Sequence, residues 1–407
     1  MTKKFKIKGL SLTFQETLGA GGQGEASKVT ADFNPHVPLV FKSMPNEPKG
    51  YERAQGLVDL SLPTLSPYLS APVVVDIHKG KIRHLSPFAP GNDLENDRPR
   101  TFAENMEIAH HLECQACILE ENSLAHGDYA PANIKISDDG GVSLIDFDNL
   151  KFPNPKFPEP QMAGQAMMMA PELRNGKTGI TIESDRFSRA VLQNMILLGR
   201  HPAEGLVKNP AERNKIMSQG LWPERQRLPE PDETPIKALG NDIAKLFDLA
   251  FSLDPIQRPS ADLWRKTLLR GLHNIYIHDC GQAFVADNKL SQCPWCHQEI
   301  DLPDTNLIIK IKVKGSNIHY KVPLEDGIPL VIGRGNVSTM SGMVSTRHLQ
   351  ITRTGSKIHI KHIGRNPSQL WSGGVWSSFD KITLDEAILR RPVHLQLADS
   401  RLEIRVV

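Results

Sequence analysis

The hydrophobic and polar positions change their periodicity along the chain and divide it into three zones. Residues 1–270 begin with strand-like runs at Lys4–Val29 and Pro38–Met44. Apolar residues at helical spacing follow, and they predict helices at Phe102–Glu121, Ser184–Leu198, Ile236–Leu253 and Ser260–Leu272. Strands first and helices afterwards predict a two-lobed α+β domain for this zone.

The C-terminal zone, residues 305–407, has the pattern of a different fold class. Its apolar and polar residues alternate over short runs that turn residues separate, as in an all-β sandwich. Strands are predicted at Leu307–Val313, His319–Leu324, Leu349–Thr352, Lys357–Ile363 and Leu402–Val407. Residues 273–303, between the two zones, are too few to build a core of their own. The chain is therefore predicted to be multidomain.

Composition agrees with a soluble globular protein of two or three domains. The chain has 407 residues, of which 39% are hydrophobic and 23% charged. No apolar run is long enough to span a bilayer, and the basic start is not followed by the apolar stretch of a secretion signal. Five cysteines argue against a disulfide framework, so we expect a cytoplasmic location.

The net charge of +2 hides an uneven distribution. Residues 305–407 contain 15 Lys and Arg against 7 Asp and Glu, a net charge of +8. The rest of the chain has 33 against 39, a net charge of −6. A basic module on an acidic body suggests an anionic partner for the module, although a solvated basic surface gives the same count.

A glycine-rich loop lies between two strand-like runs near the start of the chain. Its glycines are Gly19, Gly21, Gly22 and Gly24. Glycines let the backbone approach a nucleotide phosphate closely and point amide groups at it. Such a loop alone is weak evidence for phosphate binding, because many glycine-rich loops are simple turns. Here Lys42 follows in the next strand, where it would hold the α- and β-phosphates.

Two further motifs supply the remaining groups of a phosphoryl-transfer site. In His126-Gly127-Asp128, Asp128 would orient and deprotonate an acceptor hydroxyl, and Asn133 would bind a metal ion. In Asp146-Phe147-Asp148, Asp146 would bind the Mg²⁺ that bridges the β- and γ-phosphates of ATP. A helix cap for Asp128 and a turn position for Asp146 are the alternatives without function.

These motifs, with Ala170-Pro171-Glu172 after them, resemble the eukaryotic-like (Hanks-type) serine/threonine protein kinases of bacteria, over residues 1–270. The resemblance implies that Glu172 pairs with Arg258 in a buried ion pair. It also implies that Asp185 clamps the catalytic loop from the start of a helix.

The family pairs its phosphate-binding lysine with a glutamate from a helix. Glu52 is our candidate for that partner of Lys42, and Asp59 is the fallback.

The chain departs from the family in three places. Gly127 stands where the family has the arginine that receives a phosphorylated activation segment, and residues 146–172 contain no Ser, Thr or Tyr. We therefore predict activity that does not depend on phosphorylation of that segment. Ala130 replaces a lysine, and Asp148 replaces a glycine.

The His-Gly-Asp pattern also resembles aminoglycoside and choline phosphotransferases. The protein-kinase function therefore has three alternatives: a small-molecule phosphotransferase, a kinase-like scaffold, and a pseudokinase that acts through phosphopeptide binding.

A compact cluster of cysteine and histidine occupies the middle zone. Cys293 and Cys296 form a Cys-x-x-Cys pair whose thiolates can grip one side of a tetrahedral ion, and His278 with Cys280 can supply the other side. We predict structural zinc at these four residues, with His297 as a substitute fourth ligand. A reduced thiol cluster without metal is the alternative.

The C-terminal zone resembles a forkhead-associated (FHA) domain. Arg334 in a Gly-Arg pair, Ser345 and His348 in Ser-x-x-His, and Asn366 downstream carry the resemblance. It implies that Arg334 and Ser345 bind the phosphate of phosphothreonine, that Asn366 binds the ligand backbone, and that Arg347 adds a phosphate contact. A sandwich that only docks on the first zone is the alternative.

Together these resemblances imply a protein kinase domain at 1–270, a zinc-binding module at 273–303 and a phosphothreonine-binding domain at 305–407. ATP, Mg²⁺ and structural Zn²⁺ are the expected cofactors. A protein substrate and a phosphothreonine-containing protein are the expected partners, and similar bacterial systems include a von Willebrand A protein and a phosphatase. We expect no nucleic-acid or membrane partner.

Overall fold

The structure is a computed structural model of residues 1–407. It describes the whole chain except residues 1–3, 22–23, 139, 154–156, 159, 161–164, 175, 177, 204–208, 221, 223–232, 273, 287–289, 301–306, 317–318, 325–326, 336, 338, 390 and 407. Gly22 of the predicted glycine loop therefore lies outside the described residues.

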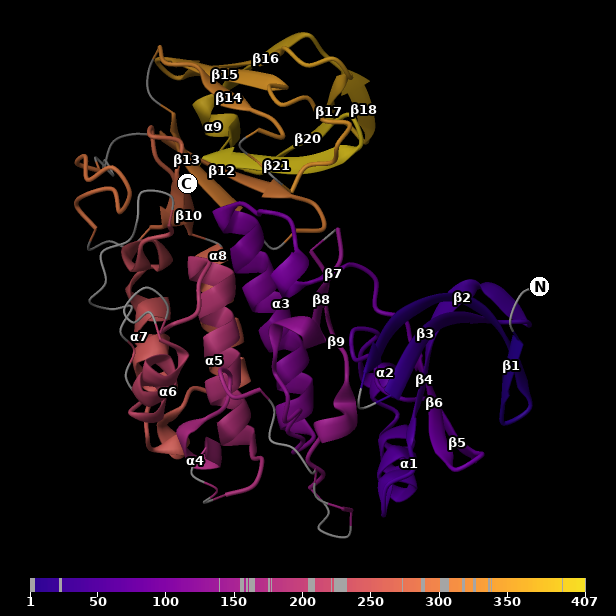
Figure 1. Ribbon diagram of the computed structural model, residues 1–407. Coiled ribbons are helices and arrows are strands. Elements are labelled where there is room, and N and C mark those ends of the chain that lie inside the picture. The colour runs from indigo at the N-terminus through magenta and orange to yellow at the C-terminus, as the bar shows by residue number, and fades with distance from the viewer. Residues whose placement is uncertain are drawn as a thin grey trace.

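The N-terminal part is a six-stranded antiparallel sheet in the order β1-β2-β3-β4-β6-β5. The strands are β1 (Lys4–Ile7), β2 (Leu10–Gly21), β3 (Gly24–Ala31), β4 (Asn34–Pro45), β5 (Val74–His78) and β6 (Lys81–Pro87). Helix α1 (Gly50–Leu60), which α2 (Leu62–Leu65) follows, packs on β5 and β6 through Ala54, Val75 and Ile82. We call this sheet with α1 the small lobe (Figure 1).

A helical part follows the small lobe. Its helices are α3 (Phe102–Glu121), α4 (Pro171–Arg174), α5 (Ile182–Leu198), α6 (Pro210–Ser218), α7 (Asn241–Ala250) and α8 (Ala261–Leu272). A capping box between Thr101 and Glu104 fixes the start of α3 because each side chain satisfies a free amide of the first turn. Helix α3 is central and packs against α5 and α8.

A short three-stranded sheet lies beside α3, on the side of the small lobe (Figure 1). Its strands are β7 (Asn92–Asp93), β8 (Ile134–Ile136) and β9 (Val142–Leu144). The turns before β8 and after β9 carry the polar residues of the candidate site.

The C-terminal part contains two sheets. The larger has the order β11-β10-β13-β12-β21-β20-β17-β18, and the smaller has the order β14-β15-β16-β19. Their buried faces share a core that includes Ile311, Ile351, Ile358, Leu395 and Ile404. The strands are β10 (Ile275–Ile277), β11 (Ala283–Val285), β12 (Leu307–Val313), β13 (His319–Leu324), β14 (Leu330–Ile332), β15 (Leu349–Thr354), β16 (Lys357–His362), β17 (Ser368–Ser372), β18 (Val375–Ser378), β19 (Lys381–Asp385), β20 (Val393–Leu397) and β21 (Ser400–Val406), with α9 (Glu386–Leu389) between β19 and β20.

The cysteine-bearing segment is built into the large C-terminal sheet. Strands β10 and β11 form a hairpin, and β10 continues the sheet by pairing in parallel with β13. On its other side the hairpin packs on the helical part. A Cβ added at Gly240 or Gly271 would lie 3.1 Å or 3.5 Å from the side chain of Val285. Residues 273–303 are thus joined both to the helices and to the strands that follow.

No helix within the described ranges is long and apolar enough to cross a membrane.

Candidate functional sites

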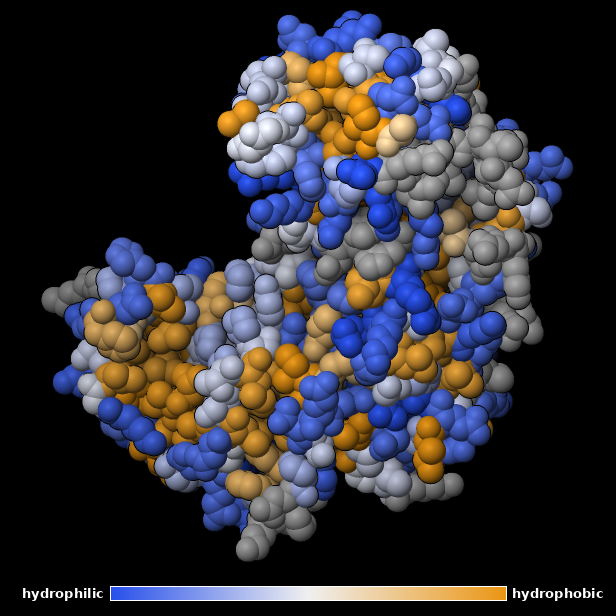
Figure 2. Space-filling view, turned by 180° about the vertical axis from the view of Figure 1, so that it is seen from behind, coloured by the Kyte–Doolittle hydropathy of each residue, from blue (hydrophilic) through white to orange (hydrophobic). Residues whose placement is uncertain are grey.

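A cavity of about 370 Å³ lies between the small lobe and the three-stranded sheet. Gly19, Val40 and Lys42 line it from β2 and β4, and Asp146 and Asp148 line it from the turn after β9. Apolar residues gather on the small lobe and along its junction with the helical part (Figure 2). Leu18, Phe88 and Ala89 also line the cavity, so it has apolar walls with a few charged groups, as ligand sites usually have.

Lys42 is one of two lysines that line this cavity, the other being Lys135. Its Nζ lies 2.9 Å from Oδ1 of Asp146 and 2.5 Å from Oδ2 of Asp148. Burial lowers the pKa of Lys42, but the carboxylates of Asp148 and Asp146 outweigh burial and raise it overall. Lys42 is therefore a permanent cation held between two acidic residues.

The prediction that Glu52 pairs with Lys42 is wrong in this structure. Glu52 is exposed on α1, and Asp148 contacts Lys42 instead. The helix presents the next residue, Arg53, whose guanidinium donates hydrogen bonds to the carbonyl oxygens of Asp148 at 2.7 Å, of Pro158 at 2.8 Å and of Leu150. A shift of one position turns a helical side chain by about 100°, which accounts for the difference.

The fallback Asp59 is also exposed on α1, and its carboxylate accepts a hydrogen bond from the amide of Gln55 at 2.8 Å.

The glycine loop forms the turn between β2 and β3. Gly21 pairs with Gly24 at the end of the hairpin, and Gly19 lines the cavity. Gly24 has a φ of 135°, and a Cβ there would lie 2.4 Å from the carbonyl oxygen of Ser43. Only glycine fits that position.

Asp146 adopts an uncommon backbone conformation. Its φ of 59° and ψ of 68° lie in the left-handed region, which residues other than glycine rarely occupy. Burial and the neighbouring carboxylate of Asp148 raise the pKa of Asp146, while Lys42 lowers it. Backbone strain of this kind concentrates at functional positions, here at the residue whose carboxylate faces the cavity.

Asp128 and Asn133 lie on the turn before β8. The side-chain amide of Asn133 donates to the backbone oxygen of Asp128 at 3.0 Å, which closes this turn. Oδ1 of Asp128 is buried and has no hydrogen-bond partner among the described residues. Burial raises the pKa of Asp128, and hydrogen bonds from Asn133 and Asn149 oppose that rise. This oxygen is closed to solvent, and neither Asp128 nor Asn133 is among the residues that line the cavity.

Asp185, at the start of α5, holds the same turn from beneath. Its carboxylate accepts hydrogen bonds from the backbone amides of His126 at 2.5 Å and of Gly127 at 3.1 Å. The predicted clamp is confirmed.

Gly127 has a φ of 78°, and a Cβ there would lie 2.5 Å from the carbonyl oxygen of Asn149. The backbone of this turn therefore excludes any larger residue, including an arginine.

The predicted ion pair between Glu172 and Arg258 is present. The two terminal nitrogens of Arg258 lie 2.7 Å and 2.8 Å from the two carboxylate oxygens of Glu172, a bidentate pair. Arg258 is 2% exposed and also donates to the carbonyl oxygen of Glu183 at 2.8 Å. The pair ties α4 to the start of α5 and to the turn before α8.

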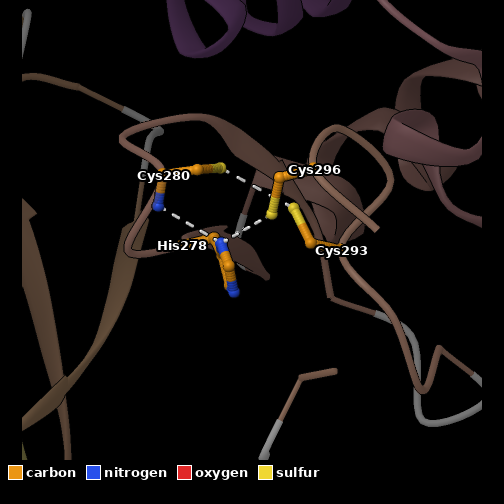
Figure 3. Close-up of side chains that lie close together, drawn as sticks. All are labelled: His278, Cys280, Cys293 and Cys296. Atoms are coloured by element: carbon orange, nitrogen blue, oxygen red, sulfur yellow. Dashed lines mark hydrogen bonds between the residues drawn. The ribbon is translucent and has the colours of Figure 1, made fainter. Parts of the chain in front are cut away.

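His278, Cys280, Cys293 and Cys296 converge between the β10–β11 hairpin and the following turn (Figure 3). One ligand atom from each of the four lies within 4.8 Å of all the others. The Sγ atoms of Cys280 and Cys293 are 3.8 Å apart, and Sγ of Cys296 is 3.5 Å from Nδ1 of His278. These four residues can hold a metal ion.

The alternative ligand His297 does not join this cluster. It is exposed, and its φ of 59° turns the chain away after Cys296, while its amide donates to the carbonyl oxygen of Cys293 at 3.0 Å. The other close pair of cysteines, Cys114 and Cys117, lies in α3, where burial raises the pKa of Cys117 to about 12.

The C-terminal candidates meet on adjoining loops of the two sheets. Ser345 Oγ accepts from the amide of Arg365 at 2.9 Å, and the side-chain amide of Asn366 donates to the carbonyl oxygen of Met343 at 2.7 Å. The amide of Arg334 donates to the carbonyl oxygen of Ser345 at 3.1 Å. The loops before β15 and β17 are therefore bound to each other.

The Arg334 and Arg347 side chains are exposed at this junction, while His348 is fully buried beneath it. His348 Nδ1 accepts from the amide of Ser345 at 3.1 Å, so the histidine supports the loop from below. The loops that carry the predicted residues are thus hydrogen-bonded to one another, and they expose two cations, Arg334 and Arg347.

No protein-family model matches this chain, and no curated protein matches it.

Proposed function

We propose that the chain is a serine/threonine protein kinase that uses ATP and Mg²⁺. The observation that carries the proposal is the contact of Lys42 with Asp146 in a cavity of about 370 Å³, although 104 positions separate them in sequence. A cation beside a carboxylate in such a cavity suits a polyphosphate with its metal ion.

Each residue has a chemical role in this proposal. Lys42 neutralises the α- and β-phosphates, and the backbone of the loop from Gly19 to Gly24 covers them. Asp146 and Asn133 offer the carboxylate and amide oxygens that suit Mg²⁺, which stabilises charge on the transferred phosphate. Asp128, with its unpartnered buried oxygen, orients the acceptor hydroxyl and takes its proton.

We further propose that the kinase does not require phosphorylation of the segment from Asp146 to Glu172. This segment has no Ser, Thr or Tyr, and the backbone at Gly127 has no room for a phosphate-binding arginine. Arg53, which donates to three carbonyl oxygens of the segment, replaces an added phosphate as its anchor.

The junction of Arg334, Ser345 and Asn366 supports binding of phosphothreonine, since the exposed guanidinium of Arg334 and the half-buried hydroxyl of Ser345 suit a dianionic phosphate. Partners carrying that modification would then be held near the kinase active site. A von Willebrand A protein and a phosphatase remain the proposed members of the same system.

Zinc is the proposed metal of the cysteine cluster. Four bonds of about 2.3 Å to sulfur and about 2.0–2.1 Å to nitrogen, at tetrahedral angles, place two sulfurs about 3.8 Å apart. The same geometry places sulfur and nitrogen about 3.5 Å apart. The pairs Cys280–Cys293 at 3.8 Å and Cys296–His278 at 3.5 Å fit these values.

One experiment tests the catalytic assignment. The purified full chain and its Asp128→Ala variant are incubated with labelled ATP and Mg²⁺, with a generic protein substrate, an aminoglycoside or choline. The proposal expects label in protein from the wild type and none from the variant. Equal labelling of protein by both, or labelling of the small molecules alone, contradicts it.

The proposed phosphothreonine-binding site has its own test. Binding of a phosphothreonine peptide and of its unphosphorylated form is measured for the wild type, Arg334→Ala and Lys381→Ala, an exposed lysine on β19. Loss of phosphopeptide binding only in Arg334→Ala is expected. Phosphopeptide binding that is unchanged in Arg334→Ala would contradict the assignment of a phosphothreonine-binding site.

A further inference from the structure

The outward face of the large C-terminal sheet carries two tryptophans. Trp371 on β17 and Trp376 on β18 face each other across the strand pair, with ring centroids 5.2 Å apart and ring planes tilted by 55°. Trp371 is 42% exposed. Large apolar groups gathered in contact with water are typical of a binding surface.

Cations surround these tryptophans because of the strand alternation. Val313, Leu395 and Leu402 are buried in the core, so the residues beside them, Lys312, His394 and Arg401, project from the opposite face. A cavity of about 370 Å³ lies among Trp371, Trp376, Lys312, Lys314, His394 and Arg401. One carboxylate, Glu403, also lines it.

The cations on this face have few partners of their own. Within the described residues no ion pair engages Lys312, Lys314 or Arg401. The Nε of Arg401 donates to Gln396 at 3.2 Å, and its guanidinium lies 5.4 Å from the ring of Trp376. Its terminal nitrogens can therefore bind a further group.

The pKa of Lys310, on the neighbouring part of β12, is lowered by burial and by the positive charges around it. Burial lowers the pKa of Lys310 first, and the neighbouring cations Arg405, Lys321 and Lys312 lower it further. An anion on this face would therefore relieve repulsion between cations.

We propose that this face, which we call the tryptophan face, binds an acidic polypeptide segment that carries an aromatic side chain. The aromatic group packs in the cavity against the Trp371–Trp376 pair, and flanking carboxylates pair with Lys312, Lys314 and Arg401. Tryptophan and arginine at the centre of a surface are the residues that dominate binding energy at protein interfaces.

Two observations favour a polypeptide over a nucleic acid. The tryptophan rings contact each other at a tilt of 55°, so they do not offer parallel surfaces on which successive bases could stack. Glu403 lies among the cations and would repel a continuous chain of phosphates, whereas separate carboxylates can avoid it.

The tryptophan face is distinct from the phosphothreonine site. It lies on the eight-stranded sheet, whereas Arg334 and Ser345 belong to the loop that connects β14 and β15 of the four-stranded sheet. Strands β17 and β18 lie at the end of the sandwich on the side of the small lobe (Figure 1). The inference therefore does not depend on the kinase activity or on phosphate binding.

The test uses the full chain and a random glutamate–tyrosine copolymer as the probe, with polyglutamate and an oligothymidylate as comparisons. Binding is followed by the anisotropy of the labelled probe for the wild type, Trp371→Ala, Arg401→Glu and Lys381→Glu. Lys381 is an exposed lysine of the other sheet, so its variant makes the same charge change elsewhere.

The copolymer is expected to bind about tenfold or more tightly than polyglutamate, and each variant of the tryptophan face to weaken it by about tenfold or more. Lys381→Glu is expected to change its Kd by less than about twofold. Three results overturn the proposal: unchanged copolymer binding in Trp371→Ala, equal weakening by Lys381→Glu, or tighter binding of the oligothymidylate that depends on Trp371.

Discussion

Lys42 and Asp148 form a 2.5 Å ion pair that joins β4 to the turn after β9. The acidic partner of the lysine therefore comes from the same turn as the proposed metal ligand Asp146, and not from α1. Helix α1 still contributes, because Arg53 holds the carbonyl oxygen of Asp148 at 2.7 Å. The position of Lys42 in the cavity thus depends on this turn.

Replacing Asp148 with asparagine removes this carboxylate and leaves the shape of the turn. We expect Asp148→Asn to weaken ATP use, kcat/KM, by about tenfold to a hundredfold, since a charge-assisted hydrogen bond is worth about 1.5–3 kcal/mol. Glu52→Gln is the matched control on α1 and is expected to change kcat/KM by less than about twofold. A larger loss in Glu52→Gln than in Asp148→Asn would contradict the assignment.

Removing one partner of the Glu172–Arg258 pair leaves a buried charge unpaired. We expect Glu172→Gln to lower the free energy of unfolding by about 3 kcal/mol. Lys266→Met, which breaks the exposed pair with Asp262, is expected to cost less than about 1 kcal/mol. Urea unfolding of the full chain measures both, and equal effects of the two substitutions would show that the pair is not stabilising.

Metal binding at the cysteine cluster predicts one ion per chain. We expect Cys293→Ser to lose the ion and to lower the Tm, as chelation of the wild type does, because Cys293 is a buried member of the cluster. Cys114→Ser changes a cysteine of α3 and is expected to keep the ion. Elemental analysis with thermal unfolding decides the matter, and a metal-free wild type of unchanged Tm speaks against the site.

Buried His126 predicts that acid destabilises the fold. Burial lowers its pKa from 6.5 to about 4, and in the neutral form its Nδ1 accepts from the amide of Asp128. The unfolded chain binds more protons between pH 6.5 and 4, so stability is full above this window and falls as the pH drops through it. The slope is about 1.4 kcal/mol per pH unit for each such group.

His126→Gln should reduce this slope, whereas replacement of the exposed His78 by glutamine should leave it unchanged. His84, whose pKa burial also lowers to about 4, contributes to the slope that remains. Unfolding curves at a series of pH values give the slope, and an identical slope in wild type and His126→Gln would refute the assignment.

Alanine substitutions at Gly127 and Gly140 distinguish the cost of backbone strain from the cost of a steric clash. Both have positive φ, 78° and 85°, but a Cβ at Gly127 meets Asn149 at 2.5 Å, while one at Gly140 meets nothing within 4 Å. Alanine should cost about 1 kcal/mol or more at either position, and clearly more at Gly127. Equal costs in urea unfolding would show that the turn relaxes.

Local sequence signals predicted the elements with strong patterns. Helix α3 begins and ends at the predicted residues, as do β12 and β13, because long periodic runs have well-defined ends. Strands β17 and β18 were not predicted, since Gly373 and Gly374 interrupt a run whose outward side is polar or aromatic. Tertiary pairing, which the local pattern does not contain, decides such strands.

The site residues likewise divide into those that local spacing predicts and those that depend on tertiary contacts. Spacing alone brought together the four possible metal ligands, because a Cys-x-x-Cys turn and a short hairpin leave little freedom. The partner of Lys42 depended on the rotation of α1 and on a contact 106 positions away. The sequence marks Asp148 as unusual, but only the folded chain shows which cation it meets.

The parallel pairing of β10 with β13 makes the protein hard to divide into separately expressed pieces. A fragment that ends before residue 305 exposes the free edge of β10, and one that begins there exposes the edge of β13. Unprotected edges recruit strands from other molecules, so both fragments are expected to aggregate. A separately expressed C-terminal part therefore has to begin before β10, so that it keeps this strand pair.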